Sequence, residues 1–95
     1  MFLVHEKKRE PGKWEIAWTW LPHFLAADSS LHKYVGQRMT EMFQGQSAGT
    51  PPETAMLALK MHQAVLSLIL EKYPIAGLRN YLEASIHLQP EESNL

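Results

Sequence analysis

Residues 14–20 alternate between apolar and polar side chains, which is the pattern of a half-buried β-strand. One face of this predicted strand carries Trp14, Ile16, Trp18 and Trp20. Aromatic and β-branched residues favour a strand over a helix. A shorter run over residues 2–9 precedes it, and Pro11-Gly12 between the two runs is a turn signal. The pattern therefore predicts a β-hairpin over residues 2–21.

The register of this hairpin is open between two arrangements. A two-residue loop would set His5 opposite Trp18, whereas a three-residue loop would pair Val4 with Trp18. Facing residues lie on the same side of a sheet. We prefer the three-residue loop because it gathers the apolar side chains on one face. That face would hold Phe2, Val4, Ile16, Trp18 and Trp20.

Helical spacing of apolar residues follows the hairpin in three segments. Asp28 is a candidate N-cap for the first segment, and Gly45 is a natural C-cap. Thr50-Pro51-Pro52-Glu53 combines a capping threonine, a proline in the first turn and a capping-box glutamate. We expect helices at about residues 29–44, 51–73 and 75–87.

These elements predict an α+β fold in the order β-β-α-α-α, with a long apolar helix at its centre. A length of 95 residues allows a single domain over residues 1–95, with a frayed tail at 88–95. No uncharged apolar run reaches about 18 residues, so we expect no membrane-spanning helix. The N-terminal residues lack the apolar region of a signal peptide, and we expect a cytoplasmic protein.

The second predicted helix is apolar around roughly two-thirds of its circumference, wider than the stripe of a typical surface helix. Either the rest of the chain wraps this helix or a second copy covers it. We favour a homo-oligomer, specifically a dimer, because the chain is short and the edges of a lone hairpin are unpaired. The expected interface residues are Arg38, Leu57, Met61 and Leu68.

His62 lies near the middle of that apolar arc, so we expect its imidazole to be buried with a lowered pKa. A buried imidazole needs a hydrogen-bond partner, and we expect a backbone carbonyl or a tyrosine. Tyr34 and Tyr81 are the candidate tyrosines. An alternative hypothesis makes His62, Tyr34 and Tyr81 the site of a small-ligand binder or an enzyme.

Other chemistry finds little support in the residues present. The chain has no cysteine, no serine in a nucleophile-elbow motif and no clustered glycines for a phosphate loop. The pairs Asp28/His32 and Glu83/His87 have helical spacing, but a cap and a solvated ion pair explain them. We therefore assign no catalytic residue, no metal site and no cofactor.

Basic residues gather at the predicted hairpin tip beside an aromatic ring. They are Lys7, Lys8, Arg9 and Lys13, next to Trp14. Such a tip suits nucleic acid, but acidic residues are interleaved there and the whole chain carries a net charge of −1. A nucleic-acid module is therefore an alternative. The leading hypothesis is a small homo-oligomeric interaction or regulatory protein with an unknown protein partner and no catalytic activity.

Overall fold

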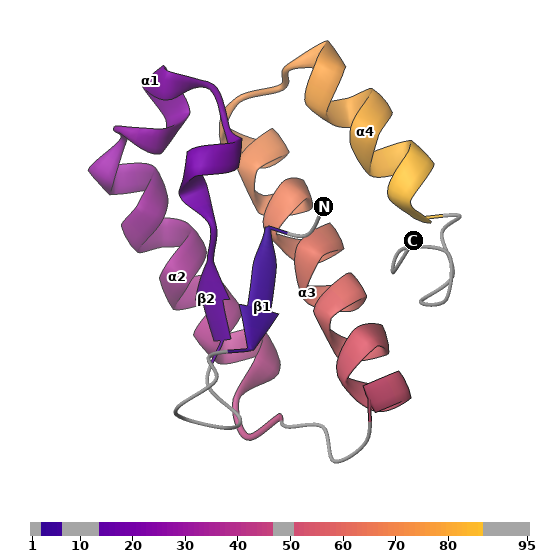
Figure 1. Ribbon diagram of the computed structural model, residues 1–95. Coiled ribbons are helices and arrows are strands. Elements are labelled where there is room, and N and C mark those ends of the chain that lie inside the picture. The colour runs from indigo at the N-terminus through magenta and orange to yellow at the C-terminus, as the bar shows by residue number, and fades with distance from the viewer. Residues whose placement is uncertain (1–2, 7–13, 47–50, 87–95) are drawn as a thin grey trace.

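A computed structural model describes residues 3–6, 14–46 and 51–86 of the chain (Figure 1). It contains an antiparallel hairpin followed by helices, which confirms the predicted α+β class. The strands are β1 (Val4–Glu6) and β2 (Trp14–Ile16). The helices are the 3₁₀ helix η1 (Trp18–Trp20) and the α-helices α1 (His23–Ala26), α2 (Ser29–Phe43), α3 (Pro51–Lys72) and α4 (Ala76–Ile86).

The three long helices lie close to their predicted bounds because local signals set their ends. The Asp28 carboxylate accepts a hydrogen bond from the Leu31 N–H at 2.9 Å and caps α2. Gly45, just beyond the end of α2, has a φ of +78°, a conformation that glycine adopts without steric cost. The connector expected between hairpin and first helix instead contains α1, whose first turn is bonded to the Pro22 carbonyl.

The hairpin is shorter than predicted, and its preferred register is wrong. Val4 pairs with Ile16, not with Trp18. The Ala17 N–H still bonds to the Leu3 carbonyl, but the chain then coils into η1, so residues 18–20 form no strand. The observed register differs from the preferred one by two residues. Because side chains alternate with a period of two, Val4 and Ile16 keep the shared face that the pattern predicted.

Helix α3 lies at the centre of the fold, and α2, α4 and β1 pack around it (Figure 1). The buried core joins residues from these elements and from the connector. It includes Leu3, Val4, Leu25, Leu31, Val35, Val65, Leu66, Ile69 and Leu78. Within the described residues, none of the helices combines the length and hydropathy needed to cross a bilayer.

The chain itself provides the cover for α3 that we expected from a second copy. Leu57, Met61 and Leu68 are only 8%, 4% and 3% exposed and belong to the core of a single molecule. They are therefore buried within one molecule, and their assignment to an interface between copies stays a prediction. The apolar arc is wide because helices and strand pack against α3 from several sides.

Candidate ligand-binding groove

His62 is buried as predicted, with 2% of its surface exposed. Its Nδ1 accepts a hydrogen bond from the backbone N–H of Leu3 at 2.8 Å. The partner at Nδ1 is thus a backbone donor, whereas the prediction named a backbone carbonyl or a tyrosine. An accepting Nδ1 carries no proton, so the ring is the neutral imidazole. Burial penalises the imidazolium and lowers the pKa of His62 to about 4.

Aromatic rings surround His62 on the side of η1 and α4. Its ring centroid lies 5.5 Å from that of Tyr81 and 6.5 Å from that of Trp20, and these two rings are 4.7 Å apart. Burial also raises the pKa of Tyr81. The structure therefore brings together two of the three residues of the predicted ligand site, as parts of a packed core.

Tyr34, the third residue of that predicted site, lies elsewhere, between α2 and α3. Its hydroxyl donates to Glu71 at 2.5 Å, and this hydrogen bond raises the pKa of Tyr34. Arg38 donates to the same hydroxyl at 3.3 Å and approaches Glu41 at 3.8 Å. Arg38 thus has partners within its own chain, and its place in an interface between copies stays a prediction.

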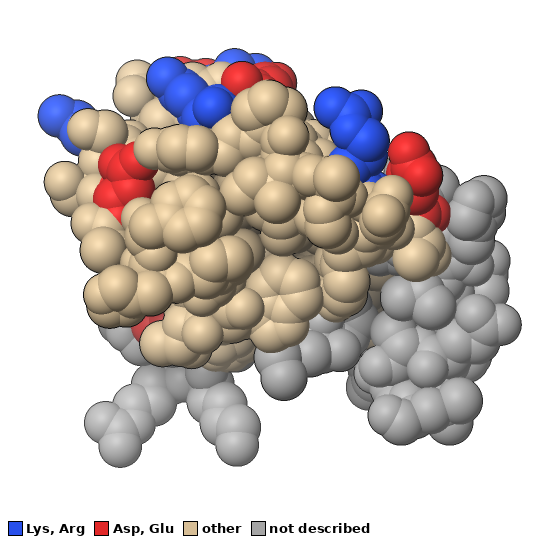
Figure 2. Space-filling view, turned by 90° about the horizontal axis from the view of Figure 1, so that it is seen from above, with Lys and Arg blue, Asp and Glu red and all other residues tan. Residues whose placement is uncertain are grey.

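The nucleic-acid alternative depends on the basic residues of the predicted hairpin tip. Lys7, Lys8, Arg9 and Lys13 are outside the described residues. Figure 2 shows the end of the molecule seen from above, where much of the visible surface is uncharged and basic and acidic side chains occur near one another. The described residues on this face form no strongly basic patch of the kind that is typical of nucleic-acid binding.

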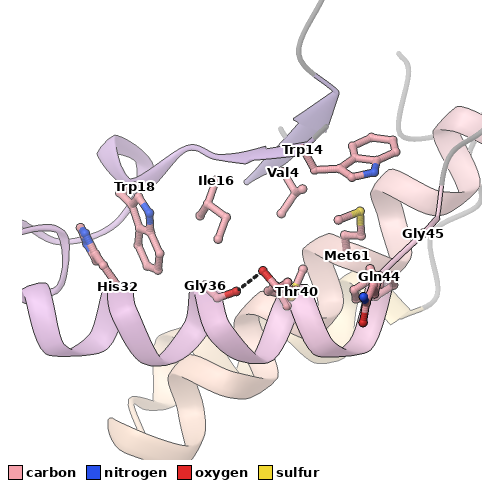
Figure 3. A pocket seen from close by; sticks show the side chains of 12 residues that line it. Val4, Trp14, Ile16, Trp18, His32, Gly36, Thr40, Gln44, Gly45 and Met61 are labelled. Carbon is pink, nitrogen blue, oxygen red and sulfur yellow. Dashed lines mark hydrogen bonds between the residues drawn. The ribbon is translucent and has the colours of Figure 1, made fainter. Parts of the chain in front are cut away.

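The candidate site that the structure does contain is a groove between the hairpin and α2 (Figure 3). Its volume is about 640 Å³. No Cα atom of β2 comes within 8 Å of α2, so side chains alone span the gap between them. The described lining residues are Val4, Trp14, Ile16, Trp18, His32, Gly36, Met39, Thr40, Phe43, Gln44, Gly45 and Met61. None of these residues carries an acidic or strongly basic side chain.

Helix α2 forms one long wall of the groove. His32, Gly36, Thr40 and Gln44 recur at every fourth position, so they form a row along one side of the helix. Twelve residues of α-helix rise about 18 Å, which makes the groove elongated. At Gly36 the groove has room to spare, because a Cβ added there would meet nothing within 4 Å. The Thr40 hydroxyl donates to the Gly36 carbonyl at 2.9 Å and so turns back onto its own helix.

A stacked pair of rings closes one end of the groove. The Trp18 and His32 rings are nearly parallel, with centroids 3.9 Å apart and an angle of 19° between their planes. Trp14 lies toward the other end, over Met61 and near the end of α2 (Figure 3). The groove is therefore bounded by aromatic rings at both ends and by aliphatic and methionine side chains between them.

Two buried nitrogens in this groove have no hydrogen-bond partner among the described residues. They are Nε1 of Trp14 and Nε2 of His32. Buried polar atoms in folded proteins are nearly always paired, and leaving one unpaired costs about 1–3 kcal/mol. Among the residues that the structure describes, no three histidine, aspartate or glutamate side chains gather as a metal site would require.

A second, smaller cavity of about 250 Å³ lies where α2 begins beside the end of α3. There the Tyr73 hydroxyl donates to the Asp28 carboxylate, which also caps α2. These hydrogen bonds lower the pKa of Asp28 and raise that of Tyr73. The Tyr73–Asp28 hydrogen bond therefore links the end of α3 to the start of α2.

Sequence reasoning named several residues of the groove, among them Trp14, His32 and Met61, but for other roles. The row His32, Gly36, Thr40 and Gln44 was the available signal, since small and polar residues at every fourth position run beside the apolar stripe of α2. Comparisons with protein-family models, with curated proteins and with solved structures found no match. A function for this chain therefore has to be inferred from the geometry of the groove.

Proposed function

We propose that this chain is a small non-catalytic binding protein that holds a largely apolar ligand in the groove between the hairpin and α2. The observation that carries the proposal is the groove itself. Its volume of about 640 Å³ falls within the range of roughly 300–1,000 Å³ that is usual for small-molecule sites. Such sites are lined mainly by apolar and aromatic side chains with a few polar atoms, as this one is.

Catalysis is not part of the proposal because the groove holds too few reactive groups. General acid–base chemistry needs a positioned titratable group, and nucleophilic catalysis also needs a base beside the nucleophile. Among the described lining residues, His32 is the only one whose side chain is an acid–base group of the kind that enzymes use. The one hydroxyl, that of Thr40, is bonded to the Gly36 carbonyl.

The homodimer stays a prediction, and the fold removes the main reason for it. The apolar arc of α3 is already buried by the chain's own elements. The exposed large apolar side chains, Phe24, Met42 and Met56, belong to three different helices. Light scattering at micromolar concentration tests the homodimer: about twice the chain mass would support it, and the mass of a single chain would contradict it.

Binding of the neutral, environment-sensitive dye Nile red tests the proposed function. We expect saturable binding of one dye molecule per chain, measured through the increase in dye fluorescence. Gly36→Leu places a side chain into the open part of the groove and is expected to weaken binding at least about tenfold. Gly77→Leu is the matched control, because Gly77 is exposed on α4, lies outside the groove and also has open space around an added Cβ.

Two results would contradict the proposal. One is the absence of saturable dye binding by the folded wild-type protein. The other is equal weakening by the Gly36 and Gly77 variants, which would place the dye outside the groove. Urea unfolding of both variants shows that each is folded under the conditions of the binding assay.

A further inference from the structure

The Trp14 indole supplies a directional polar contact in an otherwise apolar groove. An indole N–H donates a hydrogen bond and cannot accept one. Its Nε1 is shielded from water and has no partner among the described residues. In Figure 3 the nitrogen lies on the edge of the ring that is turned toward the groove and Met61. A ligand that satisfies this donor must bring an acceptor atom.

The charge of the lining restricts the ligand further. None of the described lining residues offers a carboxylate, an ammonium or a guanidinium group. A charged group brought into this groove would lose its hydration without gaining a partner of opposite charge, which is unfavourable. The lining therefore favours a ligand that is uncharged along the length of the groove.

We propose that the ligand is a neutral, elongated molecule whose carbonyl-type oxygen accepts a hydrogen bond from Trp14 Nε1. This inference rests on the proposed binding function. Its apolar body lies along α2, beside Ile16 and Met39, and reaches toward the stacked Trp18–His32 pair. The open space at Gly36 accommodates the middle of that body. The acceptor fixes the orientation, and the apolar contacts supply most of the affinity.

The oxygen reaches the nitrogen by displacing side-chain atoms that now shield it. Met61 lies below the Trp14 ring in Figure 3, and Gln44 is an exposed residue at the same end of the groove. Methionine is unbranched, with several rotatable bonds, so it can move aside at little steric cost. Filling the site then exchanges an unpaired donor for a hydrogen-bonded one, which is favourable in a low-dielectric environment.

Two neutral dyes separate the hydrogen bond from apolar packing. Nile red carries a carbonyl oxygen, whereas diphenylhexatriene is a hydrocarbon without an acceptor. Trp14→Phe keeps an aromatic ring but removes the donor. We expect this variant to bind Nile red about five- to tenfold more weakly and diphenylhexatriene within about twofold of the wild type. Ile16→Ala, in the apolar part of the groove, is the matched control and should change the two affinities by the same factor.

A second measurement does not depend on the fold of any variant. In the wild-type protein labelled with ¹⁵N, saturation with Nile red should move the Trp14 indole N–H resonance to lower field, as a new hydrogen bond does. Diphenylhexatriene should not produce this change. A Trp14 indole resonance that responds equally to both dyes would overturn the proposal.

The outcomes distinguish this inference from the function on which it rests. If neither dye binds the wild-type protein, the binding function itself fails. If both dyes bind and Trp14→Phe weakens them equally, the groove binds ligands but the indole donor does not recognise them. If the anionic dye anilinonaphthalene sulfonate displaces Nile red and binds more tightly, the preference for a neutral ligand is wrong.

Discussion

His62 and His32 each lie close to a tryptophan ring, yet their surroundings differ in one respect that matters for function. His62 is almost fully buried, and its Nδ1 accepts the N–H of Leu3. His32 stacks on Trp18 at the edge of a groove, and its Nε2 is buried without a partner among the described residues. A satisfied polar group in a closed core stabilises the fold, whereas an unsatisfied one beside a cavity indicates where another molecule can bind.

The difference arises from how closely the two strands approach the helices. Strand β1 packs directly against α3, and this contact closes the core over His62. Strand β2 stays more than 8 Å from α2 at its Cα atoms, so the space between them is only partly filled by side chains. The two strands of one small hairpin thus border a core and a groove.

The largest expected effect is a loss of stability in acid from His62. The folded pKa of about 4 lies below the unfolded value of 6.5, so the unfolded chain binds the proton first as pH falls. This contribution to stability is present above pH 6.5 and decreases between pH 6.5 and 4, by about 3 kcal/mol in all. Urea unfolding at a series of pH values measures it.

The control for this acid effect is His62→Leu, which lacks the titrating group. The free energy of unfolding of the wild type should fall more steeply below pH 6.5 than that of the variant. Parallel pH profiles for the two proteins would show that His62 is not held neutral in a closed core, and the contrast with His32 would disappear.

At neutral pH the same substitution should have a smaller effect that depends on the hydrogen bond. His62→Leu leaves the Leu3 N–H without its acceptor, so we expect a loss of about 1–3 kcal/mol in the free energy of unfolding. His32→Leu removes an unpaired nitrogen together with a ring stack, two effects that oppose each other, and should change stability by less than about 1 kcal/mol. Equal losses in the free energy of unfolding for the two variants would contradict the difference described between His62 and His32.

A substitution of Gly45, at the rim of the groove, should lower the stability of the protein through backbone strain. Its φ of +78° is unfavourable for residues with a Cβ, so Gly45→Ala is expected to lower the free energy of unfolding by about 1–2 kcal/mol. The space around an added Cβ is open, which leaves backbone conformation as the only cause. Thermal or urea unfolding measures the effect, and an unchanged midpoint would contradict a left-handed residue at this position.

The smallest expected effect has the opposite sign. Gly36 is within α2, and an added Cβ would meet nothing within 4 Å. Gly36→Ala should therefore raise the free energy of unfolding by roughly 0.5–1 kcal/mol through helix propensity. A loss of stability instead would mean that the groove is filled at this point and is not open space.

Several features could be predicted from sequence because they depend on residues a few positions apart. The Asp28 cap bonds to a backbone N–H three residues away, and helical periodicity places His62 in the middle of the apolar arc of α3. The alternation of the second strand also placed Ile16 on the same face as Val4, although the pairing itself was wrong.

The tertiary structure alone decided which distant residues meet. The N–H that His62 Nδ1 accepts is that of Leu3, 59 positions away, and no local pattern in the sequence identifies it. The coiling of Trp18–Trp20 into η1 sends one ring onto His32 and another onto Tyr81, which overrides the β-pattern of the same residues. Periodicity determined which faces are apolar because it reports on a single helix or strand. Whether such a face is closed by packing, as at His62, or left open, as between β2 and α2, depends on the distance between elements and was settled only when they assembled.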